Sequence, residues 1–486
     1  MTQVLVIGAG PAGLAAARSA RAAGADVVLL DSSDSLGGQF WRHLPPNRPA
    51  RKEALLHHGW SRFQSLATEL TADPGCEVVL GAHVWAIDAG ERPTVHVVLG
   101  EPDGHGRERV SFQPDAIVLA TGAHDRTLPF PGWDLPGVFT AGAAQALAKG
   151  ERLAVGERVV VAGAGPFLLP VAASLSATGS RVVAVMEANR TAALVRGWLP
   201  RAWQLLPAAS KGIELAGYLA GHLRHRIPYL LGRTVIAAHG TTHVESVTTA
   251  KLDREWVPIP GTEKVIEVDA VCVSHAFTPR LELALAVGCE LDADRFVRVD
   301  GRQQTSVANV NAAGEITSIG GVDLALAEGA IAGHHAAGAS GTNASLERKR
   351  TVFSRFASRI EAAHGIKRGW PVWLTAETIV CRCEEVDYGS LCSTARATDS
   401  QSLRSLKLST RAGLGICQGR VCGRTVEELL AHQTEGSALT DGTKSDRRPV
   451  AVPIRLGELA APPTTYPSPD KPPHTAATDG STKGKP

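Results

Sequence analysis

Five of the eight cysteines of this 486-residue chain lie between positions 381 and 422, and four of them form two pairs. Cys381 and Cys383 are separated by one residue, and Cys417 and Cys422 are separated by four. Four thiolates in two pairs can hold a tetrahedral zinc ion or an iron–sulfur cluster. A zinc knuckle usually has C-x-x-C at both ends, whereas two bridged irons need one cysteine pair per iron. The spacing therefore favours a [2Fe-2S] cluster, with zinc or a metal-free module as alternatives.

The surroundings of the second pair support the same chemistry. The stretch GLGICQGRVCG has glycines at 413, 415, 419 and 423. A glycine-rich loop can direct backbone N–H groups at cluster sulfurs, and such hydrogen bonds raise the reduction potential. The remaining cysteine of the region, Cys392, is expected to be a buried helix residue rather than a ligand. The pattern indicates one-electron transfer.

A second pattern lies at the N-terminus, where Gly8, Gly10 and Gly13 form G-x-G-x-x-G directly after the apolar run 4–7. In a strand–turn–helix unit the first glycine permits a tight turn, and the second lets a pyrophosphate approach the backbone. The third glycine lets helix and strand pack closely. Asp31 ends the next apolar run, near the distance at which an acid binds a ribose hydroxyl. A turn without a ligand is the alternative, but the full combination predicts a dinucleotide site.

The same order of elements recurs in VVVAGAGPFLLPVAASL, which begins at residue 159. Gly163 and Gly165 match the first two glycines, but Leu168 occupies the third position, so we expect helix and strand to lie farther apart. Glu187 ends the following strand and suits a ribose 2′-hydroxyl, which favours NAD over NADP. Binding of NAD(H) and a domain retained only for packing both stay open for this unit.

These motifs need strands and helices in alternation, and both glycine units have that order. The sequence predicts an α/β fold with two Rossmann-like domains, the first split by insertion of the second, and a small helical cluster domain. A helical segment is expected near 191–235, and the final residues, rich in Pro, Thr, Ser and Lys, are expected to be disordered. The expected parts are the first dinucleotide-binding domain (1–145 and 268–345), the second (146–267), a linker (346–372), the cluster domain (373–435), an extended segment (436–460) and the tail (461–486).

Bulk properties narrow the class of protein. The chain is too long for one hydrophobic core, and its net charge of +2 gives no reason to expect binding to nucleic acid. The N-terminus lacks the pattern of a secretory signal, and no apolar stretch is long enough for a spanning helix. We therefore expect a cytoplasmic protein without a transmembrane segment, in which clustered cysteines bind metal or are redox-active.

Three further segments favour a flavin in the first domain: SLGGQF (35–40), LATGA (119–123) and NAAGEI (311–316). With the glycine units they resemble the two-dinucleotide-binding-domain flavoproteins of the pyridine nucleotide-disulfide oxidoreductase superfamily. The resemblance implies FAD in the first domain, whose site a late glycine–acid turn completes. Glu315 stands where that family has Asp, and Asp31 stands where it more often has Glu. The FAD residues so implied are Gly8, Gly10, Pro11, Ala12, Gly13, Asp31, Gly38, Gln39, Val84, Ala120, Thr121, Gly122, Gly314 and Glu315.

The cysteine module resembles the bacterioferritin-associated-ferredoxin-like [2Fe-2S] domain, from VCRCEEV to GRTVEELLA, although that family more often closes with C-x-x-C. The longer spacing narrows the resemblance, as do STRAGLGICQGRVCG, AAGEITSIGGVDLALAEGAIAG and RRPVAVPIRLGELA. These segments are similar to the large FAD subunits of bacterial opine oxidases, hydrogen cyanide synthases and dye-linked proline or hydroxyproline dehydrogenases. The resemblance covers residues 1 to about 460, and heterotetrameric sarcosine oxidase shares the nucleotide domains.

This resemblance implies an electron-transferring chain within an oxidoreductase complex. In such a complex a separate beta-type subunit with its own FAD would oxidise the C–N bond of an amino acid or opine, so the catalytic base is expected there. Electrons would pass through the FAD and cluster of this chain to a respiratory acceptor. A further partner would be a small ferredoxin-like subunit. Membrane association would come through partners.

Two other hypotheses stay open. The first is a self-contained NADH-dependent reductase, which Glu187 favours and Leu168 opposes. The second is a scaffold that keeps FAD only for stability. A disulfide reductase is not expected, because no cysteine pair accompanies the flavin and nucleotide segments.

Overall fold

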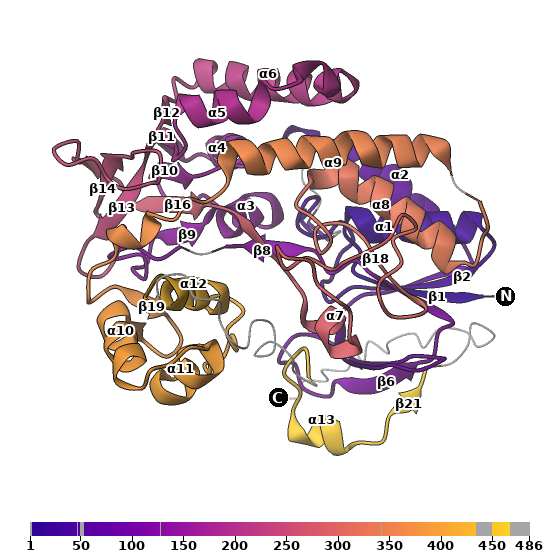
Figure 1. Ribbon diagram of the computed structural model, residues 1–486. Helices are drawn as coiled ribbons and strands as arrows, with labels where there is room; N and C mark the ends of the chain where they lie inside the picture. The colour runs from indigo at the N-terminus through magenta and orange to yellow at the C-terminus, as the bar shows by residue number, and fades with distance from the viewer. Residues whose placement is uncertain are drawn as a thin grey trace, which may run out of the picture.

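The computed structural model describes residues 2–45, 47–48, 53–126, 128–341, 343–433 and 450–466. Two parallel sheets with helices around them form the body, and a small helical domain lies beside the second sheet (Figure 1). This arrangement agrees with the predicted α/β architecture and its separate cluster domain.

The first parallel sheet has the strand order β18-β7-β1-β2-β3. Its strands are short apolar runs that are buried almost throughout, as expected for a parallel sheet covered on both faces. The late strand β18 pairs with β7, so a segment far along the chain completes this sheet. The elements are β1 (Gln3–Ile7), α1 (Pro11–Ala22), β2 (Asp26–Leu30), η1 (Glu53–Leu55), α2 (Trp60–Ala72), β3 (Cys76–Val79), β7 (Ala116–Leu119), β18 (Val310–Ala312) and α8 (Gly321–Ala336).

Helix α8 lies unusually close to α1 because two of its residues are glycines. A Cβ atom on Gly329 would stand 2.0 Å from the backbone oxygen of Ala12, and one on Gly333 would stand 2.0 Å from that of Ala16. The helices therefore meet backbone to backbone. This contact fixes the late glycine–acid turn, which precedes α8, beside the first glycine turn.

A four-stranded sheet of order β21-β6-β5-β4 lies below the first sheet (Figure 1). Its elements and neighbours are β4 (Ala82–Asp88), β5 (Thr94–Leu99), β6 (Glu108–Phe112), α7 (Glu282–Val287), α13 (Leu456–Ala460) and β21 (Thr464–Thr465). Strand β21 belongs to the predicted disordered tail, so that prediction is wrong for residues 464–466. Tyr466 stacks on Phe112 with ring centroids 4.4 Å apart, which holds this end of the chain on the sheet. The structure does not describe residues 434–449, which include the end of the predicted cluster domain and most of the predicted extended segment. Residues 467–486 of the predicted tail also lie outside the described residues.

The second parallel sheet has the order β12-β11-β10-β16-β9. Both β9 and β16 lie in it, and α3 packs on it through Ala141, Ala144 and Ala148. The second domain therefore begins before the predicted boundary at 145/146, because the preceding strand pairs here rather than in the first sheet. It also extends past the predicted boundary at 267/268. The elements are β9 (Val138–Thr140), α3 (Ala141–Gly150), β10 (Arg158–Gly163), α4 (Leu168–Ala177), β11 (Arg181–Glu187), β12 (Tyr229–Leu231) and β16 (Ala270–Ser274).

Between β11 and β12 the chain forms an outer helical layer, as the sequence predicted for most of this segment. It comprises α5 (Thr191–Trp198), η2 (Ala202–Ala208) and α6 (Ala209–Arg224). An antiparallel sheet of β13 (Arg233–His239), β14 (Ser246–Lys251) and β15 (Lys264–Glu267) follows. The short pair β8 (Ala123–Asp125) and β17 (Phe277–Pro279) joins the two Rossmann-like domains.

The linker and cluster domain complete the fold. The long helix α9 (Ala344–His364) crosses both domains beneath the outer helical layer (Figure 1). The elements that follow are η3 (Trp370–Trp373), β19 (Ile379–Cys381), β20 (Val386–Asp387), α10 (Tyr388–Ala397), α11 (Leu403–Thr410) and α12 (Gly423–Gln433). Their apolar core is continuous with that of the second domain, since Trp256, Trp370 and Trp373 join both.

Candidate functional site

A connected cavity of about 3330 Å³ runs between the two Rossmann-like domains and reaches the cluster domain. Its walls include the first glycine turn, the turn after β10, and Cys383, Cys417 and Cys422. The two kinds of chemistry that the sequence indicated therefore meet in one cavity.

The first glycine turn is built as its sequence requires. Gly8 has a φ of +107°, and a Cβ there would stand 2.3 Å from the backbone oxygen of Ala120. A Cβ on Gly13 would stand 1.7 Å from the oxygen of Gly8, so helix and strand are in backbone contact. At Gly10 the nearest atom to such a Cβ is 4.0 Å away, at Gly38. The turn is thus closed on its inner side and open at Gly10, directly before the N-terminus of α1, where a pyrophosphate would bind.

The residues predicted to contact FAD gather around this turn. Asp31 lines the cavity, and its two carboxylate oxygens accept hydrogen bonds from the amides of Ala9 (2.6 Å) and Ser33 (2.8 Å). Gly13 alone among the predicted residues is buried away from the cavity, under the turn. The predicted residues that line the cavity are Gly8, Gly10, Pro11, Ala12, Asp31, Gly38, Gln39, Val84, Ala120, Thr121, Gly122, Gly314 and Glu315.

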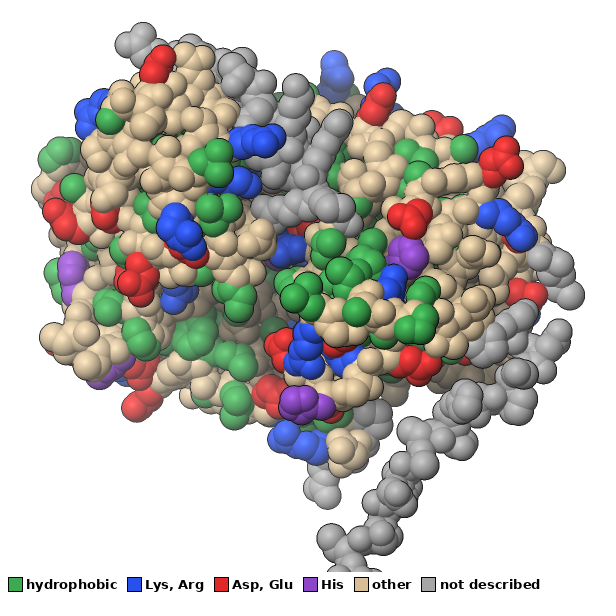
Figure 2. Space-filling model, turned by 90° about the horizontal axis from the view of Figure 1, so that it is seen from below, with side chains coloured by type: hydrophobic (Ala, Val, Ile, Leu, Met, Phe, Trp, Pro, Cys, Tyr) green, Lys and Arg blue, Asp and Glu red, His purple; other side chains and the backbone are tan. Residues whose placement is uncertain are grey.

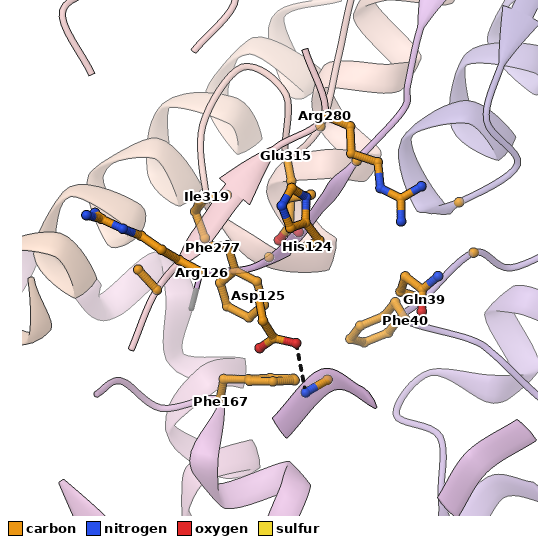
Figure 3. A pocket seen from close by; sticks show the side chains of 18 of the residues that line it. Gln39, Phe40, His124, Asp125, Arg126, Phe167, Phe277, Arg280, Glu315 and Ile319 are labelled. Carbon is orange, nitrogen blue, oxygen red and sulfur yellow. Dashed lines mark hydrogen bonds between the residues drawn. The ribbon is translucent and has the colours of Figure 1, made fainter. Parts of the chain in front are cut away.

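Two carboxyl groups lie at the late turn. Burial raises the pKa of Glu315 to about 7, and this side chain faces the cavity (Figure 3). Glu328 of α8 accepts hydrogen bonds from the Gly314 amide (2.9 Å) and the Thr317 hydroxyl (2.8 Å), and burial raises its pKa to about 7 as well. Sequence reasoning missed Glu328. The signal was present, because it is a lone acid within the small-residue helix LALAEGAIAG.

Three aromatic rings and one acid meet in the middle of the cavity (Figure 3). Phe167 and Phe277 meet edge to face with centroids 5.1 Å apart, and Phe40 faces them. Asp125 lies among these rings, where the Gly142 amide donates to it (3.0 Å) and burial raises its pKa. Apolar walls with a few fixed polar groups fit a flavin ring. His124, Asp125 and Arg126, which directly follow LATGA, were not predicted from the sequence.

In the second domain the glycine turn is also tight, but its acid is covered. A Cβ on Gly163 would stand 1.7 Å from the oxygen of Ser274. Glu187 is 0% exposed and accepts hydrogen bonds from the Gly165 amide (2.8 Å), the Asn189 amide (2.8 Å) and the Asn189 side chain (3.0 Å). Helix α4 begins at Leu168 rather than directly after the second glycine, in contrast to α1.

The residue that covers Glu187 comes from the linker. His364, the last residue of α9, places its Nδ1 2.9 Å from the Glu187 carboxylate, and Trp198 donates to its other ring nitrogen (3.3 Å). Next to it Ala363 touches Gly197, where a Cβ would stand 2.5 Å away. Asp31 lines the cavity, whereas Glu187 does not. The two acids thus occupy equivalent positions in their units, and only the first is open to a ribose.

The four cysteines converge, and their sulfurs meet across the two sequence motifs as well as within them. The Sγ atoms of Cys383 and Cys417 lie 3.6 Å apart, and so do those of Cys381 and Cys422. Two thiolates on one tetrahedral metal with bonds of about 2.3 Å stand roughly 3.8 Å apart, so each of these two contacts fits one metal ion. Within the described part of the chain, no three Cys, His, Asp or Glu side chains surround a single ion position. Two sulfur pairs supply one pair to each iron of a [2Fe-2S] cluster.

The glycine loop contacts these sulfurs as expected. The Gly413 amide donates to Cys381 Sγ at 3.5 Å, and a Cβ on Gly415 would stand 2.7 Å from Cys383 Sγ. Hydrogen bonding from the Cys422 thiol lowers the pKa of Cys417 to about 4 and that of Cys381 to about 6. Thiolates are the form that binds metal.

Cys392 lies apart from the four sulfurs, in α10. It is buried there, and burial raises its pKa. Both findings agree with its expected role as a helix residue rather than a ligand.

Polar contacts tie the cluster domain to the flavin region. His124 Nε2 lies 3.0 Å from the backbone oxygen of Arg420, whose guanidinium pairs with Glu282 at 2.6 Å. Arg126 pairs with Glu428 of α12. These contacts come from residues directly after the cavity-lining LATGA segment, so the cluster domain is held against the flavin cradle.

Comparison with known proteins agrees with this geometry. Residues 2–341 match the model of the family described as "Pyridine nucleotide-disulphide oxidoreductase", and residues 379–432 match that described as "BFD-like [2Fe-2S] binding domain". These matches confirm the predicted fold class and the predicted FAD and [2Fe-2S] cofactors. No helix in the described ranges is both long and apolar enough to cross a membrane.

Similar proteins match over most of the chain. The A chain of opine oxidase from Rhizobium meliloti is 32% identical over 95% of this chain and 88% of its own length. The hydrogen cyanide synthase component HcnB of Pseudomonas aeruginosa is 30% identical over 86% and 90%, respectively. The crystal structure of L-proline dehydrogenase from P. horikoshii shares the fold, with a TM-score of 0.66, 21% identity, and coverage of 95% of this chain and 79% of that one.

Proposed function

This chain belongs to the pyridine nucleotide-disulphide oxidoreductase family, and we propose that it is the electron-transferring subunit of a dehydrogenase complex that oxidises an amino acid or opine. The observation that carries the proposal is the shared cavity. The flavin cradle and three of the four cluster thiols border the same space. An electron can therefore pass between the two sites without leaving the protein.

The chain's own residues have separable roles in this scheme. FAD, when bound, exchanges one or two electrons, and a [2Fe-2S] cluster carries one at a time. Asp31 would bind the adenosine ribose, and the open amides at Gly10 would bind the pyrophosphate. Glu315 and the backbone of the turn that Glu328 holds would accept hydrogen bonds from the ribitol hydroxyl groups. Cys381, Cys383, Cys417 and Cys422 would hold the cluster.

Oxidation of the substrate belongs to a second subunit in this proposal. The relatives from opine oxidase, hydrogen cyanide synthase and sarcosine oxidase are each named as one subunit of their enzyme, which fits a chain that works within a complex. A beta-type, FAD-dependent subunit would remove two electrons and two protons from the C–N bond. The two electrons would then leave through this chain's cluster in two single steps, to a respiratory acceptor on the cytoplasmic side. A small ferredoxin-like subunit would fit at the cluster.

The alternative, an NADH-dependent reductase, rests on the second glycine unit. Glu187 would have to bind the ribose of NADH, but His364 already occupies its free side and the carboxylate is fully covered. A dinucleotide would have to displace the end of α9. This geometry favours entry of electrons from a partner rather than from NADH.

The test is an anaerobic mixing experiment with the purified chain, FAD and iron content having been verified. We expect NADH to leave the flavin absorbance unchanged, and dithionite to reduce flavin and cluster. Addition of a beta-type subunit with its amino-acid substrate should reduce both centres. Fast stoichiometric bleaching by NADH would refute the proposal and establish the reductase.

A further inference from the structure

The outer helical layer exposes an unusual amount of apolar surface. Its large apolar side chains are largely uncovered, with Leu206 74%, Ile213 76% and Leu223 80% exposed. Surface hydrophobic residues are ordinary when scattered, but a contiguous group marks an interaction site. The exposed members within residues 195–223 are Val195, Leu199, Trp203, Leu206, Ile213, Leu215, Leu219 and Leu223.

Helix α6 within this layer has its amphipathic character reversed. Its polar side faces the protein, where Lys211 lies 2.9 Å from Glu214 and 2.9 Å from Asp323. Its exposed stripe is Ile213, Ala216, Ala220 and Leu223, at positions i, i+3, i+7 and i+10, of which Ile213 also borders the cavity. A helix whose ion pairs face the protein and whose apolar stripe faces outward is suited to bind an apolar surface outside this chain.

The charges of the layer indicate what kind of surface it would bind. Residues 190–226 contain six Lys and Arg and one acid, Glu214, although the whole chain is nearly neutral. The acid is turned inward, toward Lys211. Five arginines of the segment are exposed, and none forms an ion pair with any residue of the described ranges: Arg190, Arg196, Arg201, Arg224 and Arg226. The layer therefore combines exposed apolar side chains, an exposed Trp203 and five exposed arginines, which we call its basic rim.

We propose that α5, η2 and α6 lie flat in the interface of an anionic lipid bilayer. Apolar side chains with Trp on one face and Arg around it are the features of in-plane membrane binding. Each arginine near an anionic surface strengthens binding, and negatively charged lipid complements the rim. The layer is the outermost on its side of the molecule (Figure 1), so it can meet a flat surface. On the opposite face acidic and basic side chains are interspersed around a group of hydrophobic ones (Figure 2).

Vesicle flotation with the purified full-length chain tests this proposal. We expect the chain to float with phosphatidylcholine vesicles that contain about 30% phosphatidylglycerol, and much less with phosphatidylcholine alone. The triple variant Leu206→Ser, Ile213→Ser, Leu223→Ser should lower the partition coefficient by at least about tenfold. The double variant Arg196→Gln, Arg224→Gln should lower it by about tenfold or more for anionic vesicles only.

The matched control replaces equally exposed apolar residues elsewhere: Val265→Ser, Leu408→Ser and Leu456→Ser. This variant should float like the wild type. Circular dichroism and gel filtration verify that all variants are folded, and a folded single variant, Leu223→Ser, serves if the triple variant is not. The proposal is overturned if the wild type does not float, if the control loses binding equally, or if the triple variant instead dissociates a dimer or loses a protein partner.

Discussion

Glu187→Gln should destabilise the second domain and leave FAD binding intact. Asp31→Asn should weaken FAD binding and leave the stability of the protein almost unchanged. The two acids end equivalent strands of the two glycine units, which makes the pair of variants a matched comparison. Glu187 accepts from four donors, two at each oxygen: Asn189 N–H and Nδ2 at one, and Gly165 N–H and His364 at the other. Glutamine can accept at only one end.

The expected loss of stability follows from the number of hydrogen-bond donors to Glu187. The NH₂ group of the glutamine would face two buried donors, and each unsatisfied buried donor costs about 1–3 kcal/mol, so we expect a loss of about 2–6 kcal/mol. Asp31 accepts from one amide at each oxygen and borders the cavity, where water can replace a lost partner. Asp31→Asn should therefore cost no more than about 1 kcal/mol of stability. It should weaken FAD binding by about 1.5–3 kcal/mol, or roughly 10- to 150-fold, because a charge-assisted bond to the ribose is lost.

Urea unfolding of the apoprotein, followed by tryptophan fluorescence, measures the first effect. Trp256 and Trp198 report on the second domain because they contact Asn189 and His364, respectively. Titration with FAD measures the loss of FAD affinity, and titration with NADH tests whether Glu187 binds a ribose. The reasoning is refuted if Glu187→Gln unfolds at the same urea concentration as the wild type. It is also refuted if the wild type binds NADH and Glu187→Gln no longer does, since Glu187 would then be a ribose ligand.

Three further results are expected. Gly10→Ala should fold normally, because Gly10 has an ordinary φ of −74° and open space, yet lower FAD affinity at least about tenfold by blocking the pyrophosphate, as measured by fluorescence titration. Cys417→Ser and Cys422→Ser, one from each sulfur pair, should each abolish the cluster's absorbance and keep FAD, whereas the control Cys392→Ser should keep both; loss of FAD as well would show that the two regions fold as one unit. Burial raises the pKa of Glu328 from 4.5 to about 7, so the native apoprotein keeps a proton that the unfolded chain releases, and its unfolding free energy should fall between about pH 4.5 and about pH 7. Glu328→Gln should reduce this slope in urea titrations and leave the share of Glu315, whose pKa burial also raises to about 7; an unchanged slope would contradict the assignment.

The parts of the site that the sequence predicted are those encoded by short spacing. The first glycine turn, Asp31 and the four cysteines each lie within a local pattern whose geometry the backbone largely determines. The composition of the tail predicted disorder, which is wrong for Thr464–Tyr466. An average over many residues hides one short strand that a tyrosine anchors. The boundary before β9 was missed because a strand of three residues has no periodicity to detect.

What the sequence did not predict depends on contacts between distant residues. Glu187 has the right position to bind ribose, and nothing near it in the chain indicates otherwise. Its partner His364 is 177 residues away, at the end of a polar helix that resembled a simple linker. The contacts of Cys383 with Cys417 and of Cys381 with Cys422 are likewise invisible from C-x-C and C-x-x-x-x-C, since each joins two different motifs.

The covered acid also explains how the cluster domain keeps its place. In an open dinucleotide domain the space beside the acid must admit a ligand, so no other element can be fixed there. Here the Trp256 indole donates to Asn189 at 3.3 Å, and Trp373 donates to the backbone of Trp256 at 2.8 Å, which links the strand end bearing Glu187 to the residues before Cys381. A buried, hydrogen-bonded joint of this kind is rigid. The joint therefore fixes the cluster domain on the second unit, beside the covered acid. Variants that loosen the joint, such as Trp373→Ala, should slow electron transfer from flavin to cluster in stopped-flow experiments without removing either cofactor.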